Sequence, residues 1–314
     1  MKINEIIKIG RPLKLLIGGS PCTYWSIAQN PNKREITNKG MGWELFKNYV
    51  IAKNKFQPDF FLYENNESIS KLIQHEIEKS LGVNLLHINS ALLSAQTRHR
   101  IYATNIKVNT TLKDKNLKVK DIIDINFHNE NLFSEVIFNS KDDTKDNNKL
   151  VRIGTIGKGG QGERVYSING KSCTLSANGG GRGAKTGLYL INGEVRKLSP
   201  LEAERLQTMP DNYTLCNGVS ESQRYKCIGN GWTAEIIIWI LSHIDIPKDY
   251  PIEVLSMYDG IATGKYCLEK LGYTNIVYKS YEIDKYAIKI ATKHYPEIIQ
   301  CGDAFQVRED NWTY

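Results

Sequence analysis

The chain has 314 residues, enough for one large domain or two smaller ones, and its 41% hydrophobic and 24% charged residues are ordinary for a globular protein. No apolar stretch reaches the length of a membrane span, and the N-terminus lacks the apolar region of a signal peptide, so the sequence excludes a membrane protein and favours the cytoplasm. The six cysteines lack metal-ligand spacing, which argues for reduced thiols and no metal site, and the net charge of +7 favours a polyanionic partner without requiring one.

The first segment, about residues 1–106, alternates short apolar runs with runs of helical spacing. We predict strands at Leu13–Ile17, Asp59–Tyr63, Leu85–Ile88 and Arg100–Ala103, and helices at Trp43–Lys55 and Ser68–Leu81. This rhythm predicts a parallel sheet with helices on both faces.

A Pro-Cys pair follows the first predicted strand, in the sequence GGSPC. Ligand sites of open α/β sheets lie beyond the carboxyl ends of strands, where Cys22 falls. A buried structural cysteine is the alternative. Glu64 in YENN, and Arg98 and Arg100 in QTRHR, lie at further strand ends, although one arginine of an alternating pair can face solvent. Taken together, the thiol, carboxyl and guanidinium predict a pocket for a heterocyclic base with an amino group and a carbonyl.

The second segment, about 107–231, loses the alternating rhythm. Residues 126–149 are polar and predict a solvated loop. Residues 152–190 are rich in glycine, which favours twisted strands with long loops. A helix is predicted at Leu198–Leu206, with Ser199 as its N-cap.

The third segment opens with a predicted helix at Ala234–Ile244 and continues into a new βαβ unit. Strands are predicted at Glu253–Met257, Ile276–Tyr281 and near Ile298–Cys301, and helices at Lys265–Leu271 and Tyr286–His294. The loop YDGIATG, after the first of these strands, is typical of turns that bind nucleotide-like ligands. Glu282, about 20 residues further on, is placed for ribose hydroxyls, and Asp303 for an adenine amino group. An adenosine-bearing cofactor is therefore predicted; NAD is the alternative, against which the missing third glycine argues.

These motifs resemble those of the DNA cytosine-5 methyltransferase family. GGSPC resembles its Pro-Cys nucleophile motif, YENN its Glu-Asn-Val motif, QTRHR its Gln-x-Arg-x-Arg motif, YDGIATG its cofactor loop and GNGW its Gly-Asn motif. Residues 196–213 resemble the segment that closes the target-recognition region, and 154–190 resemble the recognition region of restriction-modification methyltransferases that read GC-rich sites. In this family the cofactor loop precedes the cysteine, whereas here it follows, so the resemblance implies a circular permutation. A permutation predicts that Lys14–Ile17 and Glu253–Met257 are adjacent strands of one sheet.

The resemblance implies an α/β fold: the Rossmann-like mixed sheet of S-adenosylmethionine-dependent methyltransferases, circularly permuted, with a smaller glycine-rich target-recognition domain. Its parts would be the catalytic half at 1–106, the recognition domain at 107–231 and the cofactor half at 232–314. The implied reaction moves a methyl group from S-adenosylmethionine to C5 of a cytosine flipped out of duplex DNA. Cys22 would attack C6, Glu64 would hold the amino group and N3, and Arg100, with Arg98, would bind O2 or position the loop.

The remaining site residues follow from the same resemblance. The cofactor site is expected to comprise Tyr258, Asp259, Gly260, Ile261, Gly264, Glu282, Ile283, Asp303, Ala304 and Asn230. DNA contacts are expected from Gln161, Arg164, Thr174, Asn178 and Arg182, which would read GCGC or a related site such as GCNGC. A basic loop that only contacts phosphate is the alternative for Arg182 and Lys185. We expect a monomer, in a prokaryotic cell or encoded by a phage. An RNA cytosine-5 methyltransferase of the same fold and a catalytically silent DNA-binding protein remain the alternatives.

Overall fold

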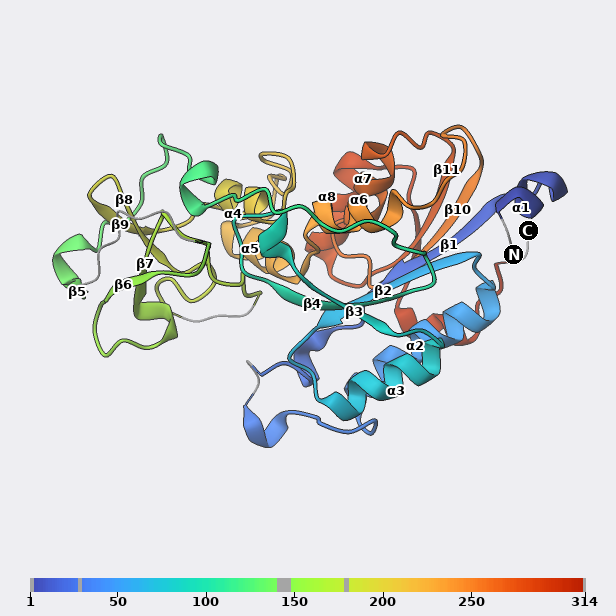
Figure 1. Ribbon diagram of the computed structural model, residues 1–314, viewed down its shortest axis with the longest axis horizontal. Coiled ribbons are helices and arrows are strands. Elements are labelled where there is room, and N and C mark those ends of the chain that lie inside the picture. Colours follow the sequence, from blue (N-terminus) through green and yellow to red (C-terminus); the bar gives the residue numbers. More distant parts are fainter. Residues whose placement is uncertain (1–2, 28–29, 140–147, 178–180, 313–314) are drawn as a thin grey trace. The chain divides into compact units, whose positions relative to one another are not determined.

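The structure is a computed structural model that describes residues 3–27, 30–139, 148–177 and 181–312 (Figure 1). The chain divides into two compact units. Unit 1 comprises Met1–Ile88, His99–Thr110 and Ile237–Tyr314, and unit 2 comprises Asn89–Arg98 and Thr111–Ile236. The short segment 89–98, which the sequence grouped with the catalytic half, is therefore part of unit 2.

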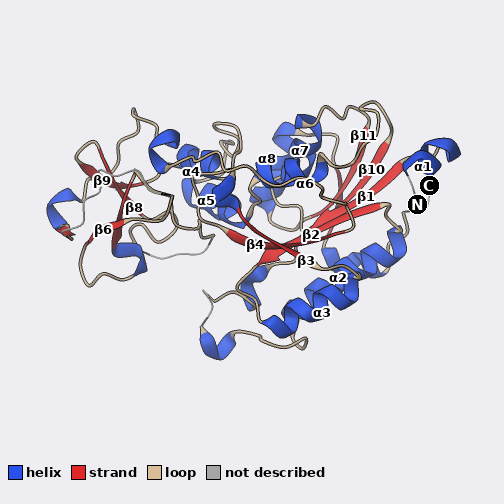
Figure 2. Ribbon diagram, viewed as in Figure 1, coloured by secondary structure: helices blue, strands red, loops and turns tan. Residues whose placement is uncertain are grey.

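Unit 1 is built on a sheet whose seven described strands follow the order β12-β11-β10-β1-β2-β4-β3 (Figure 2). The strands are β1 (Leu13–Gly18), β2 (Phe60–Asn66), β3 (Leu85–Asn89), β4 (His99–Thr104), β10 (Ile252–Met257), β11 (Ile276–Tyr281) and β12 (Ile299–Gly302). From β12 to β2 the neighbours are parallel, whereas β4 runs antiparallel to β2. The sheet is thus mixed, as the family resemblance implied, and not wholly parallel as the βαβ rhythm alone predicted.

Helices lie on both faces of this sheet (Figure 1). They are α2 (Met41–Phe56), α3 (Lys71–Leu81), α7 (Thr263–Lys270) and α8 (Lys285–His294), with α6 (Ala234–Leu241) crossing from unit 2 into unit 1. Helix α1 (Ile3–Ile9) lies beyond the amino-terminal end of β1 (Figure 1). Leu16 shares a buried cluster with residues of α2 and α3. Its neighbour Ile17 points the other way, and a Cβ on Gly264 of α7 would stand 2.2 Å from the Ile17 Cδ1. A glycine is therefore needed where α7 crosses the strand.

Local signals account for the helix ends. The helix predicted from Ser68 begins only at Lys71, because the Ser70 side chain accepts a hydrogen bond from the Ile73 N–H and acts as the N-cap. Gly82 ends the same helix in a left-handed conformation.

Strands β1 and β10 pair in parallel from Leu13 opposite Ile252 to Gly18 opposite Met257. This confirms the prediction that Lys14–Ile17 and Glu253–Met257 are adjacent strands of one sheet. The chain runs outward from this pair in both directions, through β11 and β12 on one side and β2 on the other. The pair is therefore a topological switch point, where open α/β sheets bind their ligands beyond the carboxyl ends.

Unit 2 carries a second sheet, in the order β5-β6-β7-β8-β9. Its strands are β5 (Ile137–Phe138), β6 (Arg152–Thr155), β7 (Arg164–Ser167), β8 (Leu188–Ile191) and β9 (Glu194–Lys197), and its helices include α4 (Pro200–Leu206) and α5 (Glu221–Asn230). The predicted Ser199 N-cap of α4 is confirmed, since Ser199 and Glu202 form a reciprocal capping box. The sequence did not predict α5.

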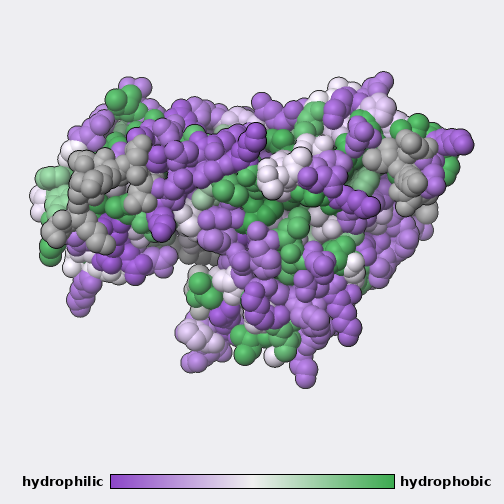
Figure 3. Space-filling model, viewed as in Figure 1, coloured by the Kyte–Doolittle hydropathy of each residue, from purple (hydrophilic) through white to green (hydrophobic). Residues whose placement is uncertain are grey.

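Hydrophilic residues cover much of the face shown in Figure 3, interrupted by smaller apolar patches. Among the residues that the structure describes, no helix has both the length and the apolar character that crossing a membrane requires.

Candidate active site

Cys22 begins a short 3-10 turn, Cys22–Tyr24, just beyond the carboxyl end of β1. The backbone N–H groups of Trp25 and Ser26 donate to the Cys22 carbonyl at 3.0 and 2.9 Å. Trp25 is fully buried and so anchors the turn. The Cys22 residue itself is half-buried and is in no disulfide. The turn thus presents a reduced thiol at the switch point of the sheet.

Two glycines bring this loop against the neighbouring strands. A Cβ on Gly18, whose φ is +153°, would stand 2.3 Å from the Met257 carbonyl oxygen of β10. A Cβ on Gly19 would stand 2.5 Å from the Glu64 carbonyl oxygen and 3.2 Å from its Oε2. The loop that leads to Cys22 therefore passes directly over Glu64, and only glycine permits this approach.

A buried polar network that the sequence analysis missed holds the loop on β2. The hydroxyls of Ser20 and Tyr63 share a hydrogen bond of 2.7 Å. The Asn65 amide donates to the Ser20 carbonyl at 3.0 Å and to the Tyr63 hydroxyl at 2.8 Å. Burial raises the pKa of Tyr63 well above its ordinary value, so the phenol stays neutral. The signal was present in the sequence, because Tyr63 and Asn65 flank Glu64 and must face the opposite side of the strand.

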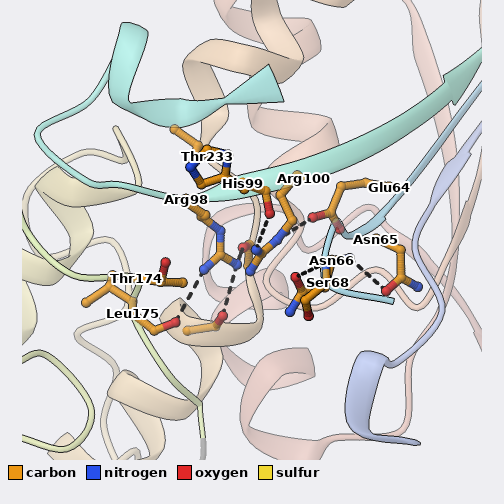
Figure 4. Close-up of polar contacts among 12 residues, drawn as sticks. Glu64, Asn65, Asn66, Ser68, Arg98, His99, Arg100, Thr174, Leu175 and Thr233 are labelled. Atoms are coloured by element: carbon orange, nitrogen blue, oxygen red, sulfur yellow. Dashed lines mark hydrogen bonds and ion pairs between the residues drawn. The ribbon is translucent and has the colours of Figure 1, made fainter. Parts of the chain in front are cut away.

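Glu64 and Arg100 form an ion pair on the other face of the sheet. The antiparallel register sets Glu64 opposite Tyr102 and Asn66 opposite Arg100, so both charged side chains share one face. The Arg100 Nε lies 2.9 Å from the Glu64 Oε1, and Figure 4 shows the guanidinium directed at the carboxylate. The two side chains are only 9% and 12% exposed. Glu64 lies within β2 and not beyond its end, since the strand continues to Asn66.

Arg98 has a different place from the one the sequence suggested. It precedes β4, is buried, and belongs to unit 2. Its guanidinium donates to the carbonyls of Leu175 at 3.3 Å, Gly229 at 3.1 Å and Gly231 at 2.8 Å (Figure 4). The alternative, in which one arginine of the pair faces solvent, does not hold, because both are buried. The observed contacts make Arg98 a tie between segments of unit 2.

The loop after β10, which the sequence predicts to bind the cofactor, is organised by Asp259. Its carboxylate accepts hydrogen bonds from the hydroxyls of Ser256 and Tyr278, both at 2.6 Å, and of Ser280 at 3.1 Å. Burial raises the pKa of this carboxyl above its ordinary value of 3.8. The loop is tightly wound, with left-handed φ at three alternate residues: Tyr258, Gly260 and Ala262.

Glu282, at the end of β11, closes this loop from the neighbouring strand. One carboxylate oxygen accepts from the Gly260 N–H at 2.8 Å, and the other from the N–H groups of Ile283 and Asp284. Asp303, after β12, is exposed and accepts from the Phe305 N–H at 2.9 Å. A carboxylate has about four acceptor positions, so both retain capacity for ligand donors.

These groups fit an adenosine-bearing cofactor. The carboxylates at two strand ends suit ribose hydroxyls and an amino group, and the Ile283 side chain beside them is 71% exposed, which suits the flat face of a base. In the described part of the chain, no group of three or more His, Cys, Asp or Glu side chains is arranged to hold a metal ion.

Other predicted cofactor residues have packing roles. Ile261 and Ala304 are each 3% exposed, and Gly264 fits α7 against the sheet. The Tyr258 hydroxyl donates to the Leu45 carbonyl at 2.7 Å. Asn230 is exposed at the end of α5 and belongs to unit 2.

Comparison with known proteins agrees with this geometry. The model of the C-5 cytosine-specific DNA methylase family matches residues 2–245. The chain belongs to this family. It is a DNA cytosine-5 methyltransferase, and S-adenosylmethionine is its methyl donor.

Individual relatives are similar to the methylase over most of its sequence. It is 30% identical over 248 residues to the type II methyltransferase M.HhaI of Haemophilus parahaemolyticus, covering 73% of this chain and 75% of that protein. It is 27% identical to the type II methyltransferase M.SsoII of Shigella sonnei, covering 71% of this chain and 62% of that protein. The solved structure of the Entamoeba histolytica methyltransferase EhMeth has a TM-score of 0.50 at 15% identity, covering 78% of this chain and 82% of that one, and shares the fold.

The predicted DNA-contacting residues of the methylase lie in unit 2. Gln161 and Thr174 are exposed, Arg164 opens β7 half-buried, and Arg182 is exposed. Asn178 lies outside the described residues. The two glycine loops touch, because the Gly183 N–H donates to the Gly162 carbonyl at 3.1 Å. The structure therefore places in contact two loops that the sequence could identify only as separate segments.

Asp259 should give the methylase a distinctive pH dependence. Because its pKa is raised by burial, the folded state binds this proton more readily than the unfolded state, and ionisation costs stability as the pH rises between the two pKa values. In Asp259→Asn this cost is absent. We therefore expect the Tm of the wild type to gain on that of the variant as the pH falls through the acidic range, measured by calorimetry.

A matched control has the opposite sign. The hydrogen bond from Arg205 lowers the pKa of Asp211, so stability from this carboxylate is lost as the pH falls through the lowered value. Wild type should then lose Tm relative to Asp211→Asn over the acidic range. If the Tm of the wild type and that of Asp259→Asn change with pH in the same way, the raised pKa of Asp259 is contradicted.

Proposed function

We propose that this methyltransferase modifies cytosine within a short GC-rich site of duplex DNA, through a transient covalent bond between the Cys22 Sγ and C6 of the base. The nearly buried ion pair between Glu64 and Arg100, directly beneath the loop that carries Cys22, supports this proposal most strongly. Cys22 supplies the nucleophile, Glu64 an acceptor for an amino group and Arg100 a donor for a carbonyl. Together these groups match the edge of cytosine.

The proposed reaction proceeds by addition and elimination. The cytosine leaves the stack, because C5 and C6 are not accessible within the duplex. The Cys22 thiolate adds to C6, while Glu64 holds the amino group and N3 and limits the charge that develops on the ring. The guanidinium of Arg100 keeps Glu64 in place and donates a hydrogen bond to O2 of the cytosine. The activated C5 takes the methyl group, a base removes the C5 proton, and the electron pair of that bond expels the thiolate.

S-Adenosylmethionine supplies an electrophilic methyl group when bound. We propose that Glu282 receives the ribose hydroxyls, Asp303 the adenine amino group, and Ile283 the face of the adenine. The loop organised by Asp259 would present its backbone to the remainder of the cofactor.

The chain order is proposed to be a circular permutation. Support comes from two observations: the family model matches only residues 2–245, and the strands outside that match, β10 to β12, pair beside β1 in the same sheet. The exposed segment before β10 would then join ends that are separate in an unpermuted chain.

Sequence reading is proposed for the two glycine loops of unit 2. Arginine pairs naturally with guanine O6 and N7, which favours Arg164, at the start of β7, as a residue that reads a base. The exposed Gln161 would enter the space of the flipped base. The relatives that bear type II names support a restriction-modification context.

The decisive experiment is bisulfite sequencing of DNA from cells that express the protein, with parallel methylation assays on duplex DNA and on tRNA. We expect conversion-resistant cytosine at one GC-rich sequence, and label in duplex DNA alone. Label in tRNA alone would instead identify an RNA methyltransferase, and no label in either would identify a silent DNA-binding protein.

Arg182 offers a test of the DNA interface. Its Nη1 lies 2.6 Å from the Glu135 Oε2, and both side chains are exposed, so DNA phosphate can replace the carboxylate. We expect Arg182→Ala to weaken duplex binding and to reduce the slope of log K against log salt by about one. Arg205→Ala, which removes another carboxylate-paired arginine of unit 2, should leave the slope unchanged. Equal slopes for wild type and Arg182→Ala would contradict a phosphate contact.

A further inference from the structure

Arg34 makes two contacts that concern the turn carrying Cys22. Its Nε donates to the Trp25 carbonyl at 2.9 Å, and its Nη2 donates to the Ser68 carbonyl at 2.5 Å. Trp25 caps the turn that Cys22 begins, and Ser68 follows the strand that carries Glu64. One guanidinium therefore bridges the turn of the nucleophile and the connection beyond the carboxylate.

Glu35 anchors the same segment on the other side. Its N–H donates to the Tyr24 carbonyl at 2.8 Å, and its carboxylate accepts from the N–H groups of Met41 at 2.9 Å and Gly42 at 3.0 Å, in the first turn of α2. The next residue, Ile36, accepts from the Ser70 hydroxyl at 2.6 Å. We call residues 34–36 with these contacts the Arg34–Glu35 clasp.

The clasp holds by polar contacts rather than by burial. Arg34 and Glu35 are half-buried, and Ile36 is 57% exposed. Trp25, in contrast, packs within the large buried cluster that α2, α3 and the sheet share. Loss of the clasp would therefore leave the core intact while removing the polar contacts that fix the backbone of the turn after β1.

We propose that Arg34 is a positioning residue for methyl transfer, which sets the place of the Cys22 Sγ relative to the Glu64 carboxylate through Trp25 and Ser68. This inference rests on the proposed nucleophilic role of Cys22. This role requires the planar guanidinium of arginine, which directs two donors to two carbonyls at once. The single ammonium of lysine does not reproduce this geometry. Small displacements of a reacting group lower rates steeply, with about a hundredfold loss for 1 Å.

The test measures attack by Cys22 separately from binding. Duplex DNA with 5-fluorocytosine at the target accumulates the covalent adduct, because the fluorine at C5 cannot leave as a proton. In Arg34→Ala we expect adduct formation to slow at least about tenfold, with the KM for S-adenosylmethionine and the Kd for DNA within about twofold of wild type. Arg34→Lys should recover only part of the rate. In the same two variants, the pH profile of Cys22 alkylation, measured at the peptide level by mass spectrometry, should differ from that of the wild type.

Arg11 provides the matched control. It forms a two-pronged ion pair with Asp59 at the opposite, amino-terminal end of β1 and β2. Arg11→Ala removes a similar tie between the same strands, and should lower the Tm as much as Arg34→Ala while the adduct forms at the wild-type rate. If Arg34→Ala does not fold, Arg34→Lys is compared with Arg11→Lys in its place.

Wild-type adduct rates in the Arg34 variants, or equal losses in the Arg11 and Arg34 variants, would overturn the positioning role. Failure of the underlying chemistry is distinguished by Cys22→Ser. If that variant still methylates DNA at the wild-type rate, the nucleophile proposal fails whatever Arg34 does. If Cys22→Ser is inactive and the Arg34 variants react normally, only the present inference fails.

Discussion

Replacement of Cys22 by serine should lower methyl transfer to duplex DNA by at least about a thousandfold. A serine hydroxyl stays protonated near neutral pH and is a far weaker nucleophile toward C6 than a thiolate. The exchange is nearly isosteric, and the turn is held by backbone bonds from Trp25 and Ser26 and not by the Cys22 side chain alone. We therefore expect unchanged Tm and DNA affinity.

Single-turnover transfer of labelled methyl groups measures this prediction. Cys216→Ser is the control, because Cys216 is a half-buried thiol of unit 2 outside the proposed site. It should react at the wild-type rate and form the adduct with 5-fluorocytosine DNA. A Cys22→Ser rate within about tenfold of wild type would exclude the covalent route.

The second large effect is expected at the ion pair of Glu64 and Arg100. Glu64→Gln should lower methyl transfer by about 10²–10⁴, since the amide neither accepts the cytosine amino group as strongly nor balances charge at N3. It also leaves the Arg100 guanidinium without its carboxylate in a site only about a tenth exposed, and removing one partner of such a buried pair costs about 3–5 kcal/mol.

A double-mutant cycle separates the two effects. In Glu64→Gln combined with Arg100→Gln, the unpaired charge is gone, so the free energy of unfolding should recover in part while methyl transfer stays low. Asp211→Asn, which breaks the more exposed pair with Arg205, should cost no more than about 1 kcal/mol and leave activity unchanged. Recovery of methyl transfer in the double variant would contradict the role of Glu64.

Much of unit 1 could be predicted because its signals are local. The strand at Ile276–Tyr281 agrees with β11 at both ends, since its apolar and aromatic residues are bounded by turns. The same holds in unit 2 for the Ser199 cap of α4, which needs only Glu202, three residues further along the chain. In contrast, α5 escaped prediction because its sequence, ESQRYKCIGN, has few apolar residues, and contacts of Arg224 with Thr214 and Glu204 help to hold it.

The sequence by itself determined which chemical groups the protein carries, and that Cys22 and the loop YDGIATG follow strands of one sheet. Its resemblance to the family also predicted the adjacency of β1 and β10, which the register confirms. Tertiary structure alone decided the partners of each group. Arg98 and Arg100 are two residues apart, yet one binds carbonyls from residues 175, 229 and 231 while the other pairs with Glu64. The physical reason is that periodicity reports only which side of a strand a residue faces, whereas hydrogen-bond partners come from segments that folding brings together across long stretches of chain.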